Sequence, residues 1–552
     1  MKNNYIRKIN LILAFLLCNA ALYSKLDAQS TASYSGLSLE YKTLQHNLCK
    51  GWNTWDTRSV VTHVLLPAYL GIELEFEDIL THKRISSPFF IGEDKELLIK
   101  ISPGAHAYDG SFSSLEFTWN DATIRIRSAH AGNDNIILLE SLNEEAKKRI
   151  RVVARVKYMW DMCGEVNLVG EHIETTRGSD FNVIYMIGGP GENTKQELRR
   201  SMSEEFVAIS TGKKRNIKEI RDIVNQAEKK HERYSDKFGK EKESYKAMQA
   251  VQAWNVVYDP WNRRAIVPVT RSWNVARGGW VLFLWDTYFS ASCLALDNKE
   301  LAYSNAINVT KGITPAGFVP NGRGQISEND YDRSQPPVGS TCVLQIYKRW
   351  KDKWFLEEVF NELLAWNRWW NEDRQRDGYL CWGSSNVPEN WNNLPSRVNV
   401  GNGGNRQDAK FESGLDNSPM YLDAEFDYQH KGRIGLLLLG DVGLMGLYVA
   451  DCNALIEIAK EMGREDVIAE LQQRAEKYAI KLKRMYSEKD GIFLNYDIAK
   501  KQPSWRLSPT LFYPLIGKVA TDEMLSGMLK KHFYNEKEFY GEYMMASAPW
   551  ND

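Results

Sequence analysis

The spacing of apolar residues changes once along this chain of 552 residues, and that change constrains its fold most. Up to about residue 211, apolar and polar residues alternate in short runs such as 150–160, as expected for strands with one buried face. From about residue 244 the apolar residues recur every three or four positions, as in 444–462, the spacing of amphipathic helices. At this length more than one core is expected, so we predict a multidomain protein with a β-rich region followed by an all-α region.

Composition shifts give the expected domain boundaries. Turn clusters at 132–134 and 188–191 separate the strand-like runs, which predicts a β-sandwich accessory domain over residues 30–211. Residues 212–243 combine an apolar stripe at helical spacing with mixed charges, typical of a solvated helical linker. Residues 244–552 contain about nine helical segments joined by glycine-rich and tryptophan-rich loops. Such an arrangement suits an α/α toroid.

The N-terminus has the pattern of a secretory signal. Lys2, Arg7 and Lys8 precede an apolar run at 11–22, and a small residue, Ala28, precedes Gln29. The run is too short for a comfortable membrane span. We therefore predict a signal peptide over residues 1–28 and export to the periplasm or the medium. A lipid anchor at Cys18 is the alternative, but the bulky residues before it argue against one.

Bulk properties exclude several classes of function. A net charge of −1 gives no electrostatic reason to expect nucleic acid or an anionic membrane as partner. The cysteines are scattered and the histidines form no HExxH motif, which argues against a zinc site. Aromatic residues make up 12% of the chain, and their flat faces suit sugar rings, although ordinary packing explains most of them.

The stretch 411–420, of sequence FESGLDNSPM, is the strongest candidate for chemistry. It places Glu412 and Asp416 around a Ser-Gly turn, and Pro419 discourages helix for the residue before it. A loop held between long helices is where a catalytic carboxylate is expected. The alternative is a helix N-cap or Asx-turn, because Asp, Asn and Ser all favour such positions.

This stretch resembles the ESG-x-D-(N/D)-SP segment of glycoside hydrolase family 63, the inverting α-glucosidases and related α-mannosyl hydrolases. Other segments follow in the family's order: GGW at 278–280 with WDTYF at 285–289, RSQPPV at 333–338, and FYGEY at 539–543. GWNTWDT at 51–57 also looks like the opening of bacterial members. The resemblance implies an (α/α)6 barrel, whose twelve helices exceed the nine segments counted here. We therefore expect a family member that lacks the C-terminal end of its barrel.

The resemblance implies that Asp416 is the general acid of an inverting hydrolase. Inverting enzymes need a second carboxylate about 6.5–9.5 Å away to activate water. The acid needs a raised pKa, through burial or a neighbouring carboxylate such as Glu412. The family's base lies well beyond the segment 539–543, and the chain ends at Asp552, so no residue matches it. Glu542 is the best substitute within the chain, although the family places it as a pocket-lining residue.

Other residues are implied to bind the substrate. Trp285 and Asp286 look like the pair that grips the sugar, with the indole stacked on the ring and the carboxylate on two hydroxyls. Arg333 and Gln335 are further hydroxyl binders by the same resemblance. A core tryptophan and a surface turn are the alternatives. The remaining substrate-binding candidates are Glu412, Asn417, Arg271, Trp273 and Trp391.

No cofactor is required by this interpretation. Asp373, Gln375 and Asp377 have the one-three-five oxygen spacing of a calcium loop, but two arginines lie between them. A simple turn before Tyr379 is the alternative. We therefore expect an exported inverting hydrolase of α-glucosidic bonds in oligosaccharides. The alternatives are an α-mannoside or trehalose-type hydrolase, or a non-hydrolytic glycan-binding protein, because the base is not identifiable.

Overall fold

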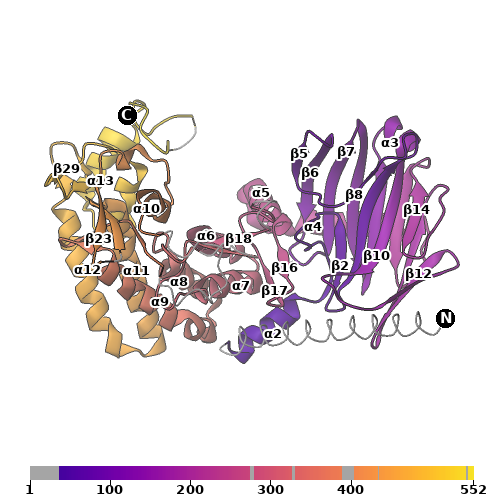
Figure 1. Cartoon of the computed structure of the whole chain (residues 1–552), viewed down its shortest axis with the longest axis horizontal. Coiled ribbons are helices and arrows are strands. Elements are labelled where there is room, and N and C mark those ends of the chain that lie inside the picture. The colour runs from indigo at the N-terminus through magenta and orange to yellow at the C-terminus, as the bar shows by residue number, and fades with distance from the viewer. Residues whose placement is uncertain are drawn as a thin grey trace, which may run out of the picture. The chain divides into compact units, whose positions relative to one another are not determined.

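A computed structural model describes residues 37–273, 279–325, 330–387, 403–432, 434–542 and 545–551. The chain forms two compact units, Met1–Ile266 and Val267–Asp552. The first runs from indigo to magenta in Figure 1 and the second from red to yellow. The predicted signal peptide, residues 1–28, lies outside the described residues and stays a prediction.

The first unit is built on two antiparallel sheets. One sheet has the strand order β1-β2-β3-β10-β14, with β4 beside β3. Its strands are β1 (Gly51–Asn53), β2 (Thr62–Leu66), β3 (Leu70–Asp78), β4 (Arg84–Ile85), β10 (Ile150–Tyr158) and β14 (Glu197–Ser201). The alternating run predicted at 150–160 forms β10, which pairs with β3 from Ile150 opposite Asp78 to Tyr158 opposite Leu70.

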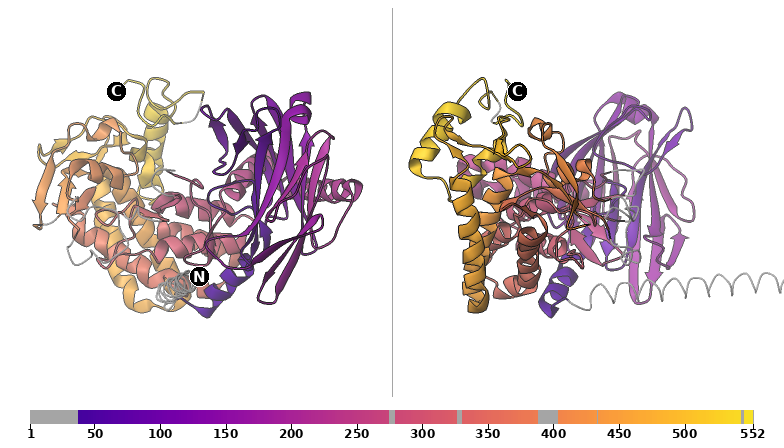
Figure 2. Two further views of the ribbon diagram at one scale, coloured as in Figure 1. Left: turned by 45° about the vertical axis from the view of Figure 1, so that its right-hand side comes forward. Right: turned by 60° about the vertical axis from the view of Figure 1, so that its left-hand side comes forward.

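The second sheet has nine strands in the order β11-β12-β13-β15-β9-β8-β7-β6-β5. They are β5 (Gly92–Asp94), β6 (Ile99–His106), β7 (Phe112–Trp119), β8 (Ala122–Ala131), β9 (Asp134–Ser141), β11 (Glu165–Val169), β12 (His172–Arg177), β13 (Asp180–Ile187) and β15 (Phe206–Thr211). One apolar core draws residues from both sheets, with the ring centroids of Phe76 and Phe117 4.3 Å apart. The two sheets are therefore the layers of a sandwich, visible in Figure 2, and the predicted β-rich N-terminal region is confirmed.

The helices of the first unit pack on its strands. They are α2 (Leu39–Leu48), α3 (Glu144–Arg149), α4 (Ile217–Tyr234) and α5 (Lys242–Trp254), with the 3₁₀ turn η1 (Ser235–Glu241) and the hairpin β16 (Val257–Asp259) and β17 (Arg264–Ile266). A capping box of Asn216 and Glu219 starts α4, whose buried Ile220 and Val224 lie against the second sheet. The indole of Trp254 donates to the carbonyl of Gly104. Because α4 and α5 pack in this way, the division between the units comes after Ile266 rather than near residue 244.

The second unit is mainly helical, which confirms the predicted helical domain. Its α-helices are α6 (Leu284–Leu294), α7 (Lys299–Thr310), α8 (Gly339–Trp350), α9 (Lys353–Asp373), α10 (Arg406–Glu412), α11 (Val442–Met462), α12 (Ile468–Lys483) and α13 (Asp522–Met528). Short turns η4 (Pro419–Tyr421), η5 (Glu465–Val467), η6 (Pro509–Leu515) and the π-turn η7 (Leu529–Phe533) connect them. Helix α6 packs against α7, and α11 packs against α8, α9 and α12. A closed (α/α)6 ring stays a prediction.

Small antiparallel sheets lie between these helices. Their strands are β18 (Val281–Phe283) with β19 (Gly322–Gly324), β20 (Gln375–Arg376) with β21 (Tyr379–Leu380), β22 (Gly383–Ser385) and β23 (Phe426–His430) on either side of β24 (Ile434–Leu437), β25 (Leu439–Gly440) and β29 (Gln502–Pro503) on either side of β28 (Tyr496–Asp497), and β26 (Tyr486–Ser487) with β27 (Ile492–Phe493). Two of them, β20–β21 and β22–β24, flank the ends of α9 and α10, which carry much of the candidate site described below.

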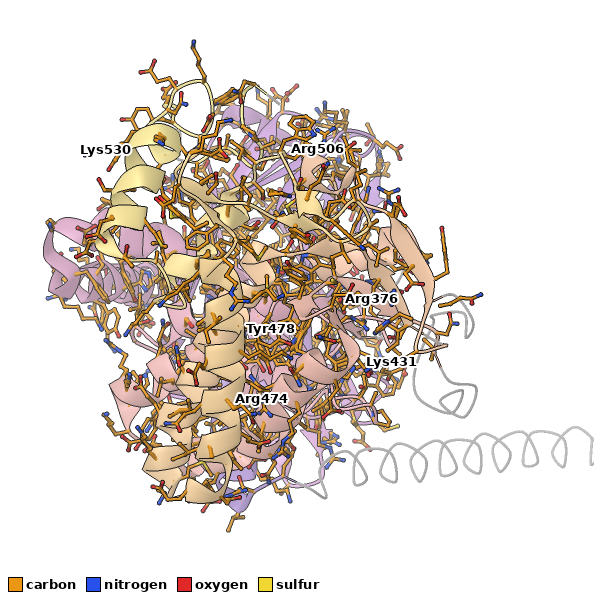
Figure 3. All side chains as sticks on the ribbon, turned by 90° about the vertical axis from the view of Figure 1, so that its left-hand side faces the viewer. Arg376, Lys431, Arg474, Tyr478, Arg506 and Lys530 are labelled. Atoms are coloured by element: carbon orange, nitrogen blue, oxygen red, sulfur yellow. The ribbon has the colours of Figure 1, made fainter. Side chains whose placement is uncertain are left out.

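Helix α11 is the central helix of the second unit. The side chain of Asp441 caps its first turn, and Gly463, at φ 72°, ends it. The helix is long and apolar enough to cross a membrane, but 83% of its most apolar window is buried inside the protein, as in a core helix. Its Tyr448 and Asp451 bond to Asn367 of α9, which also accepts a bond from Arg474 of α12. Figure 3 shows Arg474 and Tyr478 on the outermost of these helices, α12.

Candidate active site

The turn around Asp416 follows directly after the short helix α10. The helix ends at Glu412, Ser413 caps it, and the hydroxyl of Ser413 accepts the backbone N–H of Leu415 at 3.0 Å. Gly414 has φ 69°, a left-handed conformation that glycine adopts without strain. The cap of the next turn, η4, is Ser418. Asp416 therefore caps neither neighbouring helical element, and its half-buried carboxyl lies in a turn fixed from both ends.

The indole of Trp285 packs directly against this turn. A Cβ atom added to Gly414 would lie 2.4 Å from Cζ2 of Trp285, so the ring fills the space that any side chain at this position would need. The backbone N–H of Trp285 donates to Oε1 of Gln335 at 3.2 Å. The fold thus brings Trp285, Gln335 and the Asp416 turn together from three separate segments, with Asp286 next to Trp285 in α6.

Burial dominates the electrostatics of the two candidate carboxyls. It raises the pKa of Asp416, opposed by a hydrogen bond from its own backbone and by the positive charge of Arg333. It also raises the pKa of Asp286, opposed by hydrogen bonds from its own backbone and from the Trp285 side chain. A carboxyl that keeps its proton to higher pH is suited to donate one, so this direction fits a general acid at position 416.

Glu412 occupies a different environment, four residues away. Its side chain is completely buried, and its oxygens accept Nε and Nη2 of Arg374 at 2.8 and 2.9 Å. They also accept the backbone N–H groups of Ser334 at 2.9 Å and Gly383 at 2.6 Å. The expectation that Glu412 contacts substrate is therefore wrong for this structure, because protein donors occupy both oxygens. Neither does Glu412 contribute to the raised pKa of Asp416, which follows from burial.

Arg333 is also engaged by the protein. Its guanidinium pairs with Asp332 at 2.8 Å, with Asp330 at 3.0 Å and with Asp408 at 3.3 Å. Burial raises the pKa of Asp330 to about 6, against the lowering effect of Arg333. Arg333 therefore has an internal role as the cation of an acidic cluster, and its contact with substrate hydroxyls stays a prediction.

The remaining candidates are spread over the second unit. Arg271 is buried, whereas Trp273 is 54% exposed, with its ring edge-to-face against Phe283 at 4.9 Å. Asn417 is exposed beside Asp416. Glu542 is also exposed, and within the described residues it forms no hydrogen bond or ion pair with the Asp416 turn. Trp391 lies outside the described residues.

The calcium-like spacing at 373–377 forms the end of α9 and the β20–β21 hairpin. Asp377 sits in the turn at φ 51°, and Asp373 lies 3.9 Å from the Lys431 ammonium. The intervening Arg374 points to Glu412. No group of three or more His, Cys, Asp and Glu side chains in the described part of the chain is arranged to hold a metal ion.

Sequence reasoning missed the two arginine-centred clusters. The Arg374–Glu412 pair joins residues 38 positions apart, and in the sequence Arg374 is only one of the two arginines that argue against a calcium loop. The acidic residues around Arg333 are visible as Asp330 and Asp332 in the sequence, but Asp408 is distant. No local signal in the sequence marks Glu412 as buried, because an exposed glutamate at a helix end has the same pattern.

Comparison with known proteins supports the glycosidase interpretation. Residues 280–552 match the model of the mannosylglycerate hydrolase MGH1-like glycoside hydrolase domain. No curated protein matches the chain.

Several solved structures are similar to parts of the chain. A GH63 mannosylglycerate hydrolase from Thermus thermophilus in complex with glucose is 18% identical over 49% of this chain and 73% of that chain, with a TM-score of 0.38. The neutral trehalase Nth1 from Saccharomyces cerevisiae is 16% identical over 49% and 55%, with a TM-score of 0.39. A bacterial glucoamylase complexed with acarbose is 9% identical over 89% and 78%, with a TM-score of 0.44. The helical unit of this chain is thus similar, over residues 280–552, to the MGH1-like glycoside hydrolase domain.

Proposed function

We propose that this chain is an exported, inverting glycosidase that cleaves α-linked glycosides, with Asp416 as the general acid. The observation that carries the proposal is the half-buried Asp416 carboxyl, whose pKa is raised by burial, in a turn that packs against Trp285. Export rests on the signal-like segment at residues 1–28. Oligosaccharides with α-glucosidic bonds are the first candidate substrates.

In this mechanism Trp285 and Asp286 hold the sugar ring whose bond is broken. Asp416 gives its proton to the glycosidic oxygen as the bond from that oxygen to the anomeric carbon breaks. A water molecule attacks the anomeric carbon from the opposite face and gives a proton to a second carboxylate, so the configuration inverts. The second carboxylate is not assigned here, since Glu542 is exposed and makes no described contact with the Asp416 turn.

An α-mannoside with a small polar aglycone is the second candidate substrate. The name of the matching domain model, which is that of a mannosylglycerate hydrolase, favours this class. Asp416 would act in the same way on either sugar, because the acid protonates the leaving oxygen and does not touch the hydroxyl at which glucose and mannose differ. The specificity between them would depend on the groups that contact that hydroxyl.

The proposal is tested with purified protein on a panel of α-glucosides, trehalose and α-mannosides that includes mannosylglycerate. Proton NMR would follow which anomer of the sugar appears first. We expect the β-anomer first, and a loss of about 10²- to 10⁴-fold in kcat for Asp416→Asn, the range typical of a missing general acid. Asp423→Asn, which changes an exposed carboxylate seven residues away that pairs with Arg506, should retain kcat within a few-fold.

Two outcomes would contradict the proposal. Initial release of the α-anomer would mean a retaining mechanism, and full activity of Asp416→Asn would exclude Asp416 as the acid. Tight sugar binding by calorimetry without hydrolysis of any substrate would instead support a glycan-binding protein.

A further inference from the structure

We propose that the buried pair Arg374 and Glu412 is a positioning device that holds the general-acid turn against the sugar-binding residues. This inference rests on the proposed glycosidase function and assigns to both residues a role without substrate contact. Their side chains are 0% exposed, so neither can touch a sugar without a rearrangement of the surrounding fold.

Glu412 lies where four segments of the second unit meet. It lies at the end of α10, and Arg374 follows α9. Ser334, which donates to Oε1, belongs to the loop between β19 and α8, and Gly383, which donates to Oε2, begins β22. Each oxygen therefore receives one backbone N–H and one guanidinium N–H. A displacement of Glu412 would break bonds to all three other segments at once.

These bonds close a circuit of contacts around the candidate site. Glu412 holds Ser334, and the adjacent Gln335 accepts the backbone N–H of Trp285. The indole of Trp285 packs on Gly414, which is two residues after Glu412 and two before Asp416. The circuit thus fixes the acid turn, the sugar-stacking ring and a hydroxyl-binding residue relative to one another.

Arg374 is held as firmly as its partner. Its Nη1 donates to the hydroxyl of Ser385 at 3.1 Å, and its guanidinium carbon lies 4.4 Å from the ring centroid of Trp369. The backbone carbonyl of Asp332, the residue that pairs with Arg333, accepts the backbone N–H of Ser385 at 2.6 Å. A bidentate guanidinium–carboxylate pair has a fixed geometry, which suits it to set the distance between segments.

The first unit offers a matched pair as a control. Asp78, whose side chain is 3% exposed, accepts two bonds from Arg149 and two from the backbone N–H groups of Leu80 and Thr81. This pair has the same chemistry as Arg374 and Glu412 but belongs to the β-sandwich. A change in its geometry should affect stability and leave the chemistry of the second unit unaltered.

The main variant is Glu412→Asp, which keeps the charge opposite Arg374 but shortens the side chain by one methylene. With a hydrolysed glycoside as substrate, we expect kcat to fall by about 10- to 100-fold, because a displacement of about 1 Å in a catalytic group has effects of this size. The alkaline limb of the kcat–pH profile should keep its position, because Asp416 remains the proton donor. Asp78→Glu should keep the wild-type kcat.

A double variant, Arg374→Met with Glu412→Met, separates positioning from stability. It leaves no buried unpaired charge, so its Tm should lie closer to that of the wild type than the Tm of Glu412→Gln. Its kcat should stay low, since Ser334 and Gly383 have lost their acceptor. Recovery of both Tm and kcat would overturn the proposal and leave the pair as a stabilising element only. Loss of the alkaline limb in Glu412→Asp would overturn it as well.

Hydrogen exchange provides a readout that does not depend on activity. In Glu412→Asp and the double variant, peptides covering residues 330–336 and 413–418 should exchange faster than in the wild type, while Asp78→Glu should leave them unchanged. Unchanged exchange in both Glu412 variants would contradict the positioning role. If the wild type hydrolyses no glycoside, the proposed function fails, and this exchange experiment still decides whether the pair orders the turn.

Discussion

Buried carboxylates behave in opposite ways in the two units. In the β-sandwich, burial alone would raise the pKa of Asp78 and of Glu197, but arginine partners outweigh it. Arg149 and two backbone N–H groups lower the pKa of Asp78, and Arg84 with Arg199 lowers that of Glu197 to about 2.

In the helical unit, burial prevails. It raises the pKa of each of the following carboxyls: Asp286, Asp330, Asp408, Glu412, Asp416, Asp441 and Asp451. The β-sandwich thus holds its buried acids in ion-pair networks with arginines that stabilise the ionised form. In the helical unit burial opposes ionisation, which costs stability when these carboxyls ionise but is the property that acid catalysis needs at Asp416.

The largest expected effect comes from removing Arg333, the cation of the acidic cluster in the helical unit. Arg333→Met removes the cation of Asp330, Asp332 and Asp408, whose other partners in the described residues are the neutral Asn321, Ser384 and Asn405. We expect a loss of about 3–5 kcal/mol in the free energy of unfolding, as for other broken buried pairs. Denaturant unfolding at pH 7 would measure it.

Arg84→Met in the first unit is the matched control. Glu197 would keep Arg155 at 3.1 Å and Arg199 at 2.5 Å, and Glu75 would keep Arg155 at 3.2 Å. The loss should therefore be smaller, about 1–2 kcal/mol. Equal losses of unfolding free energy in the two variants would contradict the prediction that the Arg333 cluster depends more on its cation than the Arg84 cluster does.

The two units should respond to pH in opposite directions. The folded pKa of Glu197, about 2, lies below its ordinary 4.5, so its stabilising contribution is complete above 4.5 and is lost as the pH falls towards 2. The folded pKa values of Asp330, Asp441 and Asp451, about 6, lie above the ordinary 3.8, so stability falls as the pH rises from 3.8 to 6. Each shift corresponds to at most about 3 kcal/mol.

Scanning calorimetry between pH 3 and 8 would measure both trends. Acidification from pH 6 to 4.5 should raise the Tm of the helical unit. It should lower the Tm of the sandwich, because burial lowers the pKa of His63 from 6.5 to about 3 and unfolding would let this imidazole take up a proton. Glu197→Gln should flatten the acid limb of the sandwich transition only. Parallel pH trends for the two transitions would contradict the comparison.

Two glycines with similar left-handed φ angles allow a further comparison of the two units. Gly414 and Gly132 have φ of 69° and 64°, but a Cβ on Gly132 meets nothing within 4 Å, whereas one on Gly414 meets Trp285. Gly132→Ala should cost only the strain of the left-handed backbone, about 1 kcal/mol. Gly414→Ala adds a displacement of Trp285 and should lower kcat/KM by about 10-fold or more. Steady-state kinetics with both variants would check this, and equal kcat/KM would exclude close packing at the acid turn.

Local sequence patterns could predict much of this molecule because they depend on neighbouring residues. The alternation at 150–160 gave β10, Gly463 ended α11, and the Ser-Gly turn at 413–414 placed Asp416 in a loop. Long-range packing could not be predicted in this way. The residues at 212–243 look like a solvated linker, yet Ile220 and Val224 pack into the first unit.

Long-range contacts in the candidate site could not be predicted from local patterns either. Nothing near Glu412 in the sequence indicates that Arg374, Ser334 and Gly383 would surround it, at separations of 29 to 78 residues. An acid that faces substrate and an acid that faces an arginine look alike in one sequence. Burial and partners distinguish them, and both depend on the tertiary fold.

The smallest expected effect tests whether its surroundings alone decide how an aspartate carboxyl contributes to the free energy of unfolding. Asp451 accepts the backbone N–H of Ser340 at 3.3 Å and Nδ2 of Asn367 at 2.7 Å. Asp451→Asn removes a buried charge at pH 8 but turns one acceptor into a donor, so the free energy of unfolding should change by no more than about 1 kcal/mol. The same replacement at Asp78 removes the charge opposite Arg149 and should cost about 3 kcal/mol.

Thermal unfolding of both variants at pH 5 and 8 would measure these two changes in stability. A large loss for Asp451→Asn at pH 8 would mean that the ionised carboxylate is stabilised in the helical unit, against the direction of its pKa. A small change there and a large one at Asp78 would show that the ionised carboxylate stabilises the fold in the sandwich but not among the helices.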